Sequence, residues 1–145
     1  MSVPVWKRNL SKAEYIYQTY RMNIRLGEIL ANKPKKYQKN YSDELIKTAL
    51  SALKHLQVAD SIFLTKRSTE KECEIREENL LLAKAEIAHV ATVAYIFLEI
   101  VRTHDVASEG EYGKIYDQEL EIGDMCERCY NLVDGVIKSD KYIKS

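Results

Sequence analysis

The sequence predicts an all-α protein that folds as one four-helix bundle with up-down-up-down topology. Residues that break helices are scarce, since the 145 residues include only five Gly and two Pro, and both Pro lie within the first 34 positions. Apolar residues recur at three- and four-residue steps in four separate stretches, which is the spacing of amphipathic helices. No stretch of four or more residues that alternates strictly between apolar and polar is bounded by turn signals, so no strand is expected.

The first helix is expected from Lys12 to Asn32. Ser11 and Glu14 have capping-box spacing, in which each side chain bonds the backbone amide of the other residue. Pro34 ends the pattern, because proline has no amide hydrogen and restricts the residue before it. The expected apolar stripe is Ala13, Ile16, Tyr20, Ile24, Gly27 and Leu30.

A basic connection leads to the second helix, for which Asn40 or Ser42 is the expected cap. Asp43 and Glu44 in its first turn complement the positive end of the helix dipole. Its expected stripe is Leu45, Ile46, Ala49, Leu53, Leu56, Ala59, Ile62 and Phe63.

The third helix is expected from Thr69 to Thr103, after a short polar connection over residues 65–69. Its charged beginning is expected to project past the neighbouring helices, because the helix would be about 50 Å long. Its apolar seam is the clearest in the chain: Leu80, Ala83, Ile87, Val90, Ala94, Phe97 and Val101.

The pattern lapses between His104 and Gly113, and the last helix follows. Its expected face is Ile115, Ile122, Cys126, Cys129, Val133 and Val136. We therefore expect a single domain over residues 1–145, with an N-terminal arm over residues 1–10 and a short basic tail over residues 140–145. Short connections favour neighbouring helices that run in opposite directions.

Export and membrane insertion are not expected. The longest apolar stretch, Ala85 to Val101, is interrupted by Glu86, His89 and Glu99. The N-terminus lacks the apolar core of a signal peptide, and three cysteines fit reduced thiols. The expected location is the cytoplasm, with no membrane partner.

No catalytic residue, metal ligand or cofactor is predicted. Cys126 and Cys129 have C-x-x-C spacing, but both fall on the apolar face of a helix, where they are expected to pack as small core residues. The three histidines do not form the paired motif of a di-iron bundle, and His89 is expected to be partly buried with a hydrogen-bond partner.

Charge is distributed unevenly, although the formal net charge is zero. Residues 1–39 contain nine Lys or Arg and two acids, a surplus of seven positive charges, whereas residues 99–140 contain eleven acids and four bases. The last helix carries an acidic set that fits a solvated face: Asp117, Glu119, Glu121, Asp124 and Glu127.

The basic region is the candidate functional site. Its cations can neutralise phosphates, and the interleaved Tyr15, Tyr17, Tyr37 and Tyr41 could stack on exposed bases. The alternative from the same residues is a solvated surface that pairs with the acidic last helix, within a subunit or between subunits. The predicted nucleic-acid-binding residues are Lys7, Arg8, Lys12, Arg21, Arg25, Lys33, Lys35, Lys36 and Lys39.

Three short segments, together with the four-helix layout, resemble a family of small bacterial and phage proteins. The segments are Met1-Ser2-Val3-Pro4, Lys7-Arg8-Asn9-Leu10-Ser11-Lys12-Ala13-Glu14-Tyr15 and Lys138-Ser139-Asp140-Lys141-Tyr142. The family includes the accessory variability proteins of diversity-generating retroelements and proteins encoded in intervening sequences of the large ribosomal RNA.

This resemblance implies a homopentameric, barrel-like assembly without catalytic residues. For the retroelement branch it implies a basic surface that binds RNA or DNA, and a reverse transcriptase partner in the mutagenic copying of a template repeat. The expected function is thus a non-enzymatic, nucleic-acid-binding accessory protein. The alternatives are a protein of the ribosomal RNA intervening-sequence type and a purely structural oligomeric interaction protein.

Overall fold

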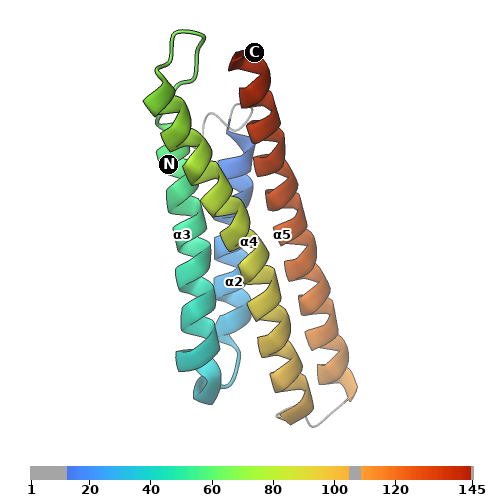
Figure 1. The fold of residues 1–145 in the computed structure, drawn as a ribbon. Coiled ribbons are helices and arrows are strands. Elements are labelled where there is room, and N and C mark those ends of the chain that lie inside the picture. The colour runs from blue at the N-terminus through green and yellow to red at the C-terminus, as the bar shows by residue number, and fades with distance from the viewer. Residues whose placement is uncertain (1–12, 105–108, 145) are drawn as a thin grey trace, which may run out of the picture.

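The structure is a computed structural model that describes residues 13–104 and 109–144, and these residues form helices and connections without a strand. Its four α-helices are α2 (Glu14–Ala31), α3 (Asp43–Asp60), α4 (Glu70–His104) and α5 (Glu109–Lys144). Figure 1 shows them side by side in an elongated arrangement. Both α2 and α4 contact α3 and α5, so the apolar faces of all four helices meet in one core. The all-α class predicted from the sequence is confirmed.

The centre of the core is α4, and its predicted seam is confirmed in full. All seven residues of the seam are buried, and Leu98 joins them. The seam alternates steps of three and four residues, so it follows the 3.6-residue turn without drifting around the helix. The predicted projection of its charged beginning is wrong, because Arg76 in this segment bonds Asp140 of α5.

The buried face of α2 differs from the predicted stripe. Ala13, Ile16 and Leu30 are buried as expected, but Tyr20 is only partly buried and Ile24 is 45% exposed. Successive steps of four residues turn the stripe by about 40° each, so it leaves the core face. The residues that replace it are Tyr15, Thr19, Met22, Leu26 and Ile29. The polar Thr19 is tolerated there because its hydroxyl donates to the Tyr15 carbonyl at 2.8 Å.

The connection from α2 to α3 is itself helical. A 3-10 turn, η1 (Lys35–Tyr37), runs into a π-helical turn, η2 (Gln38–Ser42), and α3 follows directly. The predicted cap at Ser42 is therefore wrong, since Ser42 has helical backbone angles and its side chain makes no capping hydrogen bond. A cap residue must leave the helical conformation, and here the preceding turn continues into the helix.

The end of α3 comes earlier than the predicted stripe. Leu45, Ala49, Leu56 and Ala59 are buried, but the helix ends at Asp60 and Phe63 is 85% exposed in the following connection. α4 then begins with a capping box. The Thr69 hydroxyl accepts from the Glu72 amide at 3.1 Å, and the Glu72 carboxylate accepts from the Thr69 amide at 2.9 Å.

α5 is longer at both ends than expected. It begins at Glu109, so Gly110 and Gly113 lie inside the helix, and it continues to Lys144. Glycine disfavours a helix by only about 1 kcal/mol. Residues 140–144 of the predicted basic tail form the last part of this helix, whereas residue 145 lies outside the described residues. Lys144 donates to the carbonyls of Thr65, Lys66 and Ser68, which ties this end to the α3–α4 connection.

Candidate nucleic-acid interface

The predicted cations separate into groups when the chain folds. Lys7, Arg8 and Lys12 lie outside the described residues. Arg21 and Arg25 lie on α2, Lys33 follows it, and the remaining three lysines lie on η1 and η2. The structure therefore places the six described cations along α2 and at the end of the bundle where α2 leads into α3, not on one continuous patch.

Arg25 is committed to an ion pair inside the molecule. Its guanidinium donates to both carboxylate oxygens of Glu121 on α5, one of them at 2.9 Å, and to Glu28 at 3.3 Å. The hydrogen bond to Glu121 raises the pKa of Arg25, and the same bond lowers the pKa of Glu121. Arg25 therefore agrees with the alternative interpretation, in which the basic region pairs with the acidic last helix.

Lys33 also turns towards α5, where it donates a hydrogen bond to Gln118. Burial lowers the pKa of Lys33, and the positive charge of Lys114 adds to the effect. Sequence reasoning missed Lys114, because this lysine belongs to the acidic part of the chain and reaches the basic connection only through folding.

Lys35, Lys36 and Lys39 are exposed at this end of the bundle, and we call them the lysine cluster. The segment that carries them is anchored by two tyrosines. The ring centroids of Tyr37 and Tyr41 lie 6.2 and 5.8 Å from that of Phe97, which is fully buried in α4. The cluster is thus held on the core by aromatic packing, a geometry that favours phosphate contacts by several lysines together.

The tyrosines are poorly placed for the stacking role expected from the sequence. Tyr15 is buried, and its hydroxyl donates to Asp60 at 2.8 Å. Tyr37 and Tyr41 pack against Phe97, and Tyr17 lies 6.5 Å from the ring of Tyr20. The folded site therefore presents cations that can contact phosphates, but few exposed tyrosine rings on which bases could stack.

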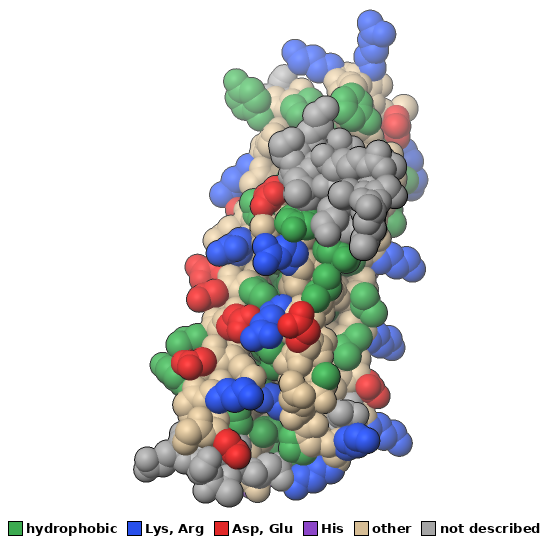
Figure 2. All heavy atoms as spheres, turned by 180° about the vertical axis from the view of Figure 1, so that it is seen from behind, with side chains coloured by type: hydrophobic (Ala, Val, Ile, Leu, Met, Phe, Trp, Pro, Cys, Tyr) green, Lys and Arg blue, Asp and Glu red, His purple; other side chains and the backbone are tan. Residues whose placement is uncertain are grey.

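A groove lies between α2 and α5, with a volume of about 360 Å³. Met22 and Cys129 are buried beside it, and Arg21 and Arg128 are exposed at its rim. Arg128 was not predicted, because nothing in the local sequence of α5 distinguishes it from a solvated charge. Figure 2 shows the molecule from the α2 side, where basic and acidic side chains are interspersed across the surface.

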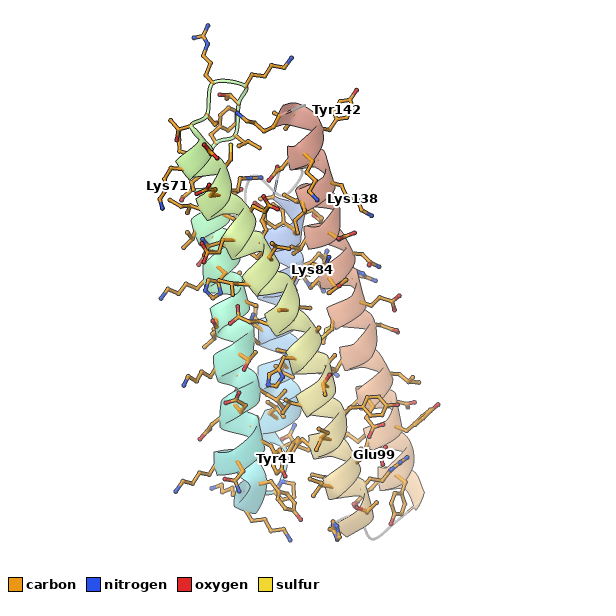
Figure 3. All side chains as sticks on the ribbon, viewed as in Figure 1. Tyr41, Lys71, Lys84, Glu99, Lys138 and Tyr142 are labelled. Carbon is orange, nitrogen blue, oxygen red and sulfur yellow. The ribbon has the colours of Figure 1, made fainter. Side chains whose placement is uncertain are left out.

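One member of the acidic set does not lie on a solvated face. Glu119 is 2% exposed, and neither carboxylate oxygen has a hydrogen-bond partner within residues 13–104 and 109–144. Burial raises the pKa of Glu119 to about 7; the charge of Glu99 acts in the same direction, and Arg102 opposes it. Arg102 itself binds the Glu99 carboxylate. Figure 3 shows Glu99 at the same end of the bundle as Tyr41.

The cysteines and histidines form no group that could hold a metal ion in the part of the chain that the structure describes. Cys126 and Cys129 are buried, as predicted, and burial raises the pKa of the first thiol to about 12 and of the second to about 11. His89 is exposed and lies 3.7 Å from Glu44, so the prediction that it is partly buried is wrong.

α4 carries more apolar surface than this one bundle buries. By length and composition it contains a window that could cross a membrane, a test that the core helix of a soluble protein also passes. Only 33% of that window is buried. Leu81, Leu82, Tyr95 and Ile96 all lie exposed on this helix.

Comparison with known proteins finds no match to a family model, to a curated protein or to a solved structure.

Proposed function

We propose that the chain is a cytoplasmic, non-enzymatic accessory protein that binds RNA or DNA through its lysine cluster. The observation that carries this proposal is the exposure of Lys35, Lys36 and Lys39 on a segment that Tyr37 and Tyr41 fix to Phe97. Three cations on one anchored segment contact a phosphate backbone together, without base recognition.

The resemblance of the sequence supports a reverse transcriptase of a diversity-generating retroelement as the protein partner. It also supports a homopentameric barrel of up-down-up-down bundles. In favour of that topology, the α3–α4 connection lies at one end of Figure 1, and the α2–α3 connection and the start of α5 lie at the other. α2 also contacts α5, which closes the ring of four helices.

Salt dependence tests the lysine cluster. We compare binding of a fluorescent single-stranded RNA to the wild type, to K35Q/K36Q/K39Q and to K54Q/K66Q/K71Q, which removes three exposed lysines elsewhere. The cluster variant is expected to reduce the slope of log affinity against log salt by about 2, because each lost phosphate contact removes about 0.7 for single strands. Equal slopes for the two triple variants, or no salt-sensitive binding by the wild type, would contradict the proposed site.

The neighbouring genes test the retroelement. A gene for a reverse transcriptase and a pair of near-identical repeats are expected close by, and the reverse transcriptase should co-purify with this protein. Location inside an insertion of a large ribosomal RNA gene would favour the intervening-sequence branch instead.

The exposed apolar side chains of α4 favour a second candidate, an oligomeric interaction protein without nucleic-acid binding. Leu81 and Tyr95 lie exposed on this helix, and Ala85, Ala88 and Thr92 fill the intervening three- and four-residue steps. These steps have the spacing of a coiled-coil seam.

Sedimentation at low and high salt separates the two assembly mechanisms. An oligomer held by the apolar side chains of α4 persists at high salt, whereas one held by paired charges dissociates. L81E/Y95E should yield monomers, and Leu50→Glu, at an exposed leucine of α3, should not. A wild-type protein that assembles but shows no salt-sensitive RNA binding would favour this second candidate.

A further inference from the structure

The groove between α2 and α5 combines an apolar floor with a charged rim. Met22 and Cys129 are buried, and Met125 beside them is half-buried. The rim residues are Gln18, Arg21, Arg25, Glu28, Glu121 and Arg128. A volume of about 360 Å³ falls within the usual range of small-molecule sites.

The rim contains two arginines besides Arg25. Arg25 forms ion pairs with Glu121 and Glu28, so these three charged groups neutralise one another in part. Arg21 lies 5.9 Å from the Tyr17 ring, and neither Arg21 nor Arg128 forms an ion pair with any of the described residues. These two guanidinium groups come from different helices, α2 and α5, and both face the same groove.

We propose that this groove seats one unpaired nucleotide, whose phosphate binds Arg21 and Arg128 and whose base lies on the half-buried Met125. Guanidinium groups match the geometry of phosphate oxygens, and methionine sulfur packs well on aromatic rings. The inference rests on nucleic-acid binding by the chain and adds a preference for single strands.

Single strands are favoured because a base in a duplex is already stacked and paired. Only an unpaired base can turn into a groove without the cost of leaving its stack. The lysine cluster, which contacts phosphates alone, should treat both forms of nucleic acid more nearly alike.

The experiment measures affinity for a fluorescent oligouridylate and for an RNA duplex of equal length, at one salt concentration. The variants are R21Q/R128Q and a control, K54Q/K71Q, which removes the same charge elsewhere; circular dichroism checks their helix content. We expect R21Q/R128Q to weaken single-strand binding by about tenfold relative to the control and to abolish the preference over the duplex.

A second measurement locates the base directly. Oligouridylate containing 4-thiouridine is crosslinked by light to the wild-type protein, and the modified peptide is identified. Crosslinks to residues 21–25 or 125–129 support the groove. Crosslinks confined to residues 35–41, together with equal affinities for R21Q/R128Q and its control, would overturn the inference and leave the lysine cluster intact as the proposed site. If the wild-type protein bound neither the oligouridylate nor the duplex, the proposed function itself would be refuted.

Discussion

The carboxyl group of Glu119 lies between α4 and α5 and faces Glu99 and Arg102, both on α4. Arg25 on α2 binds Glu121, and Lys33, just after α2, binds Gln118, so neither neutralises Glu119. A pKa of about 7 means that the folded protein holds the proton of this carboxyl group more tightly than the unfolded chain does. Protonated Glu119 is the form that suits a buried site.

Stability is therefore expected to fall as the pH rises from about 5 to 8. The contribution of Glu119 is fully present below its unfolded pKa, near 4.5, and is lost as the pH passes its folded pKa. The expected loss is about 2–3 kcal/mol in the free energy of unfolding. Glu119→Gln should remove this fall, which urea denaturation at pH 5, 6, 7 and 8 measures.

The control for this measurement is Glu127→Gln, an exposed carboxylate on the same helix. It should retain the pH dependence of the wild type. If the free energy of unfolding of Glu119→Gln changed with pH as that of the wild type does, Glu119 would not be the group that holds the proton.

Single residues of the site could be predicted only where their role depends on local sequence. The exposed Lys35, Lys36 and Lys39 follow from a charged connection beside a proline. The uneven charge distribution indicated that the basic region could pair with the last helix, but it could not show that Arg25 binds Glu121, because these residues are 96 positions apart. Burial of Glu119 was missed for the same reason, because its neighbours Glu99 and Arg102 belong to another helix.

At the scale of the helices, Arg76 joins three elements. Its guanidinium donates to Asp140 at 2.6 and 3.2 Å and to the carbonyls of Ala59 and Ile62 at 3.0 Å each. The Ala59 carbonyl lies in the last turn of α3, where it also accepts from the Ile62 amide at 3.1 Å, and the Ile62 carbonyl lies just past the end of the helix. One side chain of α4 thus caps α3 and binds α5.

Arg76→Ala is expected to lower the free energy of unfolding by about 2–4 kcal/mol, because it removes the partner of Asp140 and the side-chain hydrogen bonds to two carbonyls. Urea denaturation measures the loss. Arg67→Ala, at an exposed arginine of the nearby connection, should change stability by less than about 0.5 kcal/mol. Equal losses for the two variants would mean that Arg76 does not link the helices as described.

The start of α4 depends on its capping box. Thr69→Ala removes the acceptor for the Glu72 amide and should cost about 1 kcal/mol of stability, whereas Thr69→Ser keeps the hydroxyl and should cost less. Thermal unfolding of both variants checks the difference. An equal loss for Ala and Ser would show that the hydroxyl is not the stabilising group.

Elements were predictable where the pattern was strict. α4 repeats three- and four-residue steps over its buried length, and every predicted seam residue is buried. In α2 the predicted stripe turns away from the core, and the face that is buried includes the polar Thr19, whose hydroxyl bonds within the helix. The cap at Ser42 failed because a π-helical turn, which has no simple sequence signal, precedes α3.

For the molecule as a whole, the acids of the last helix are partly neutralised by cations of other helices in the same chain. Arg25 binds Glu121, Arg76 binds Asp140 and Lys84 binds Asp134 at 2.7 Å. The exposed lysine cluster lies at one end and takes no part in these three ion pairs. A net charge of zero therefore does not argue against binding a polyanion there, because local potential and not net charge governs the contact.

Phe97 links the lysine cluster to the core, so we expect one substitution there to weaken both stability and RNA binding. Phe97→Ala should lower the free energy of unfolding by about 3–5 kcal/mol and also free Tyr37 and Tyr41, so the lysines lose their common anchor and RNA binding weakens. Leu98→Ala, at an equally buried neighbour, should cost stability but keep this aromatic contact. Fluorescence anisotropy of a labelled RNA, measured at a temperature where both variants are folded, separates the effect on RNA affinity from the effect on stability. Equal RNA affinities for the two variants would show that the cluster binds without an ordered connection, and that its charge alone supports the interface.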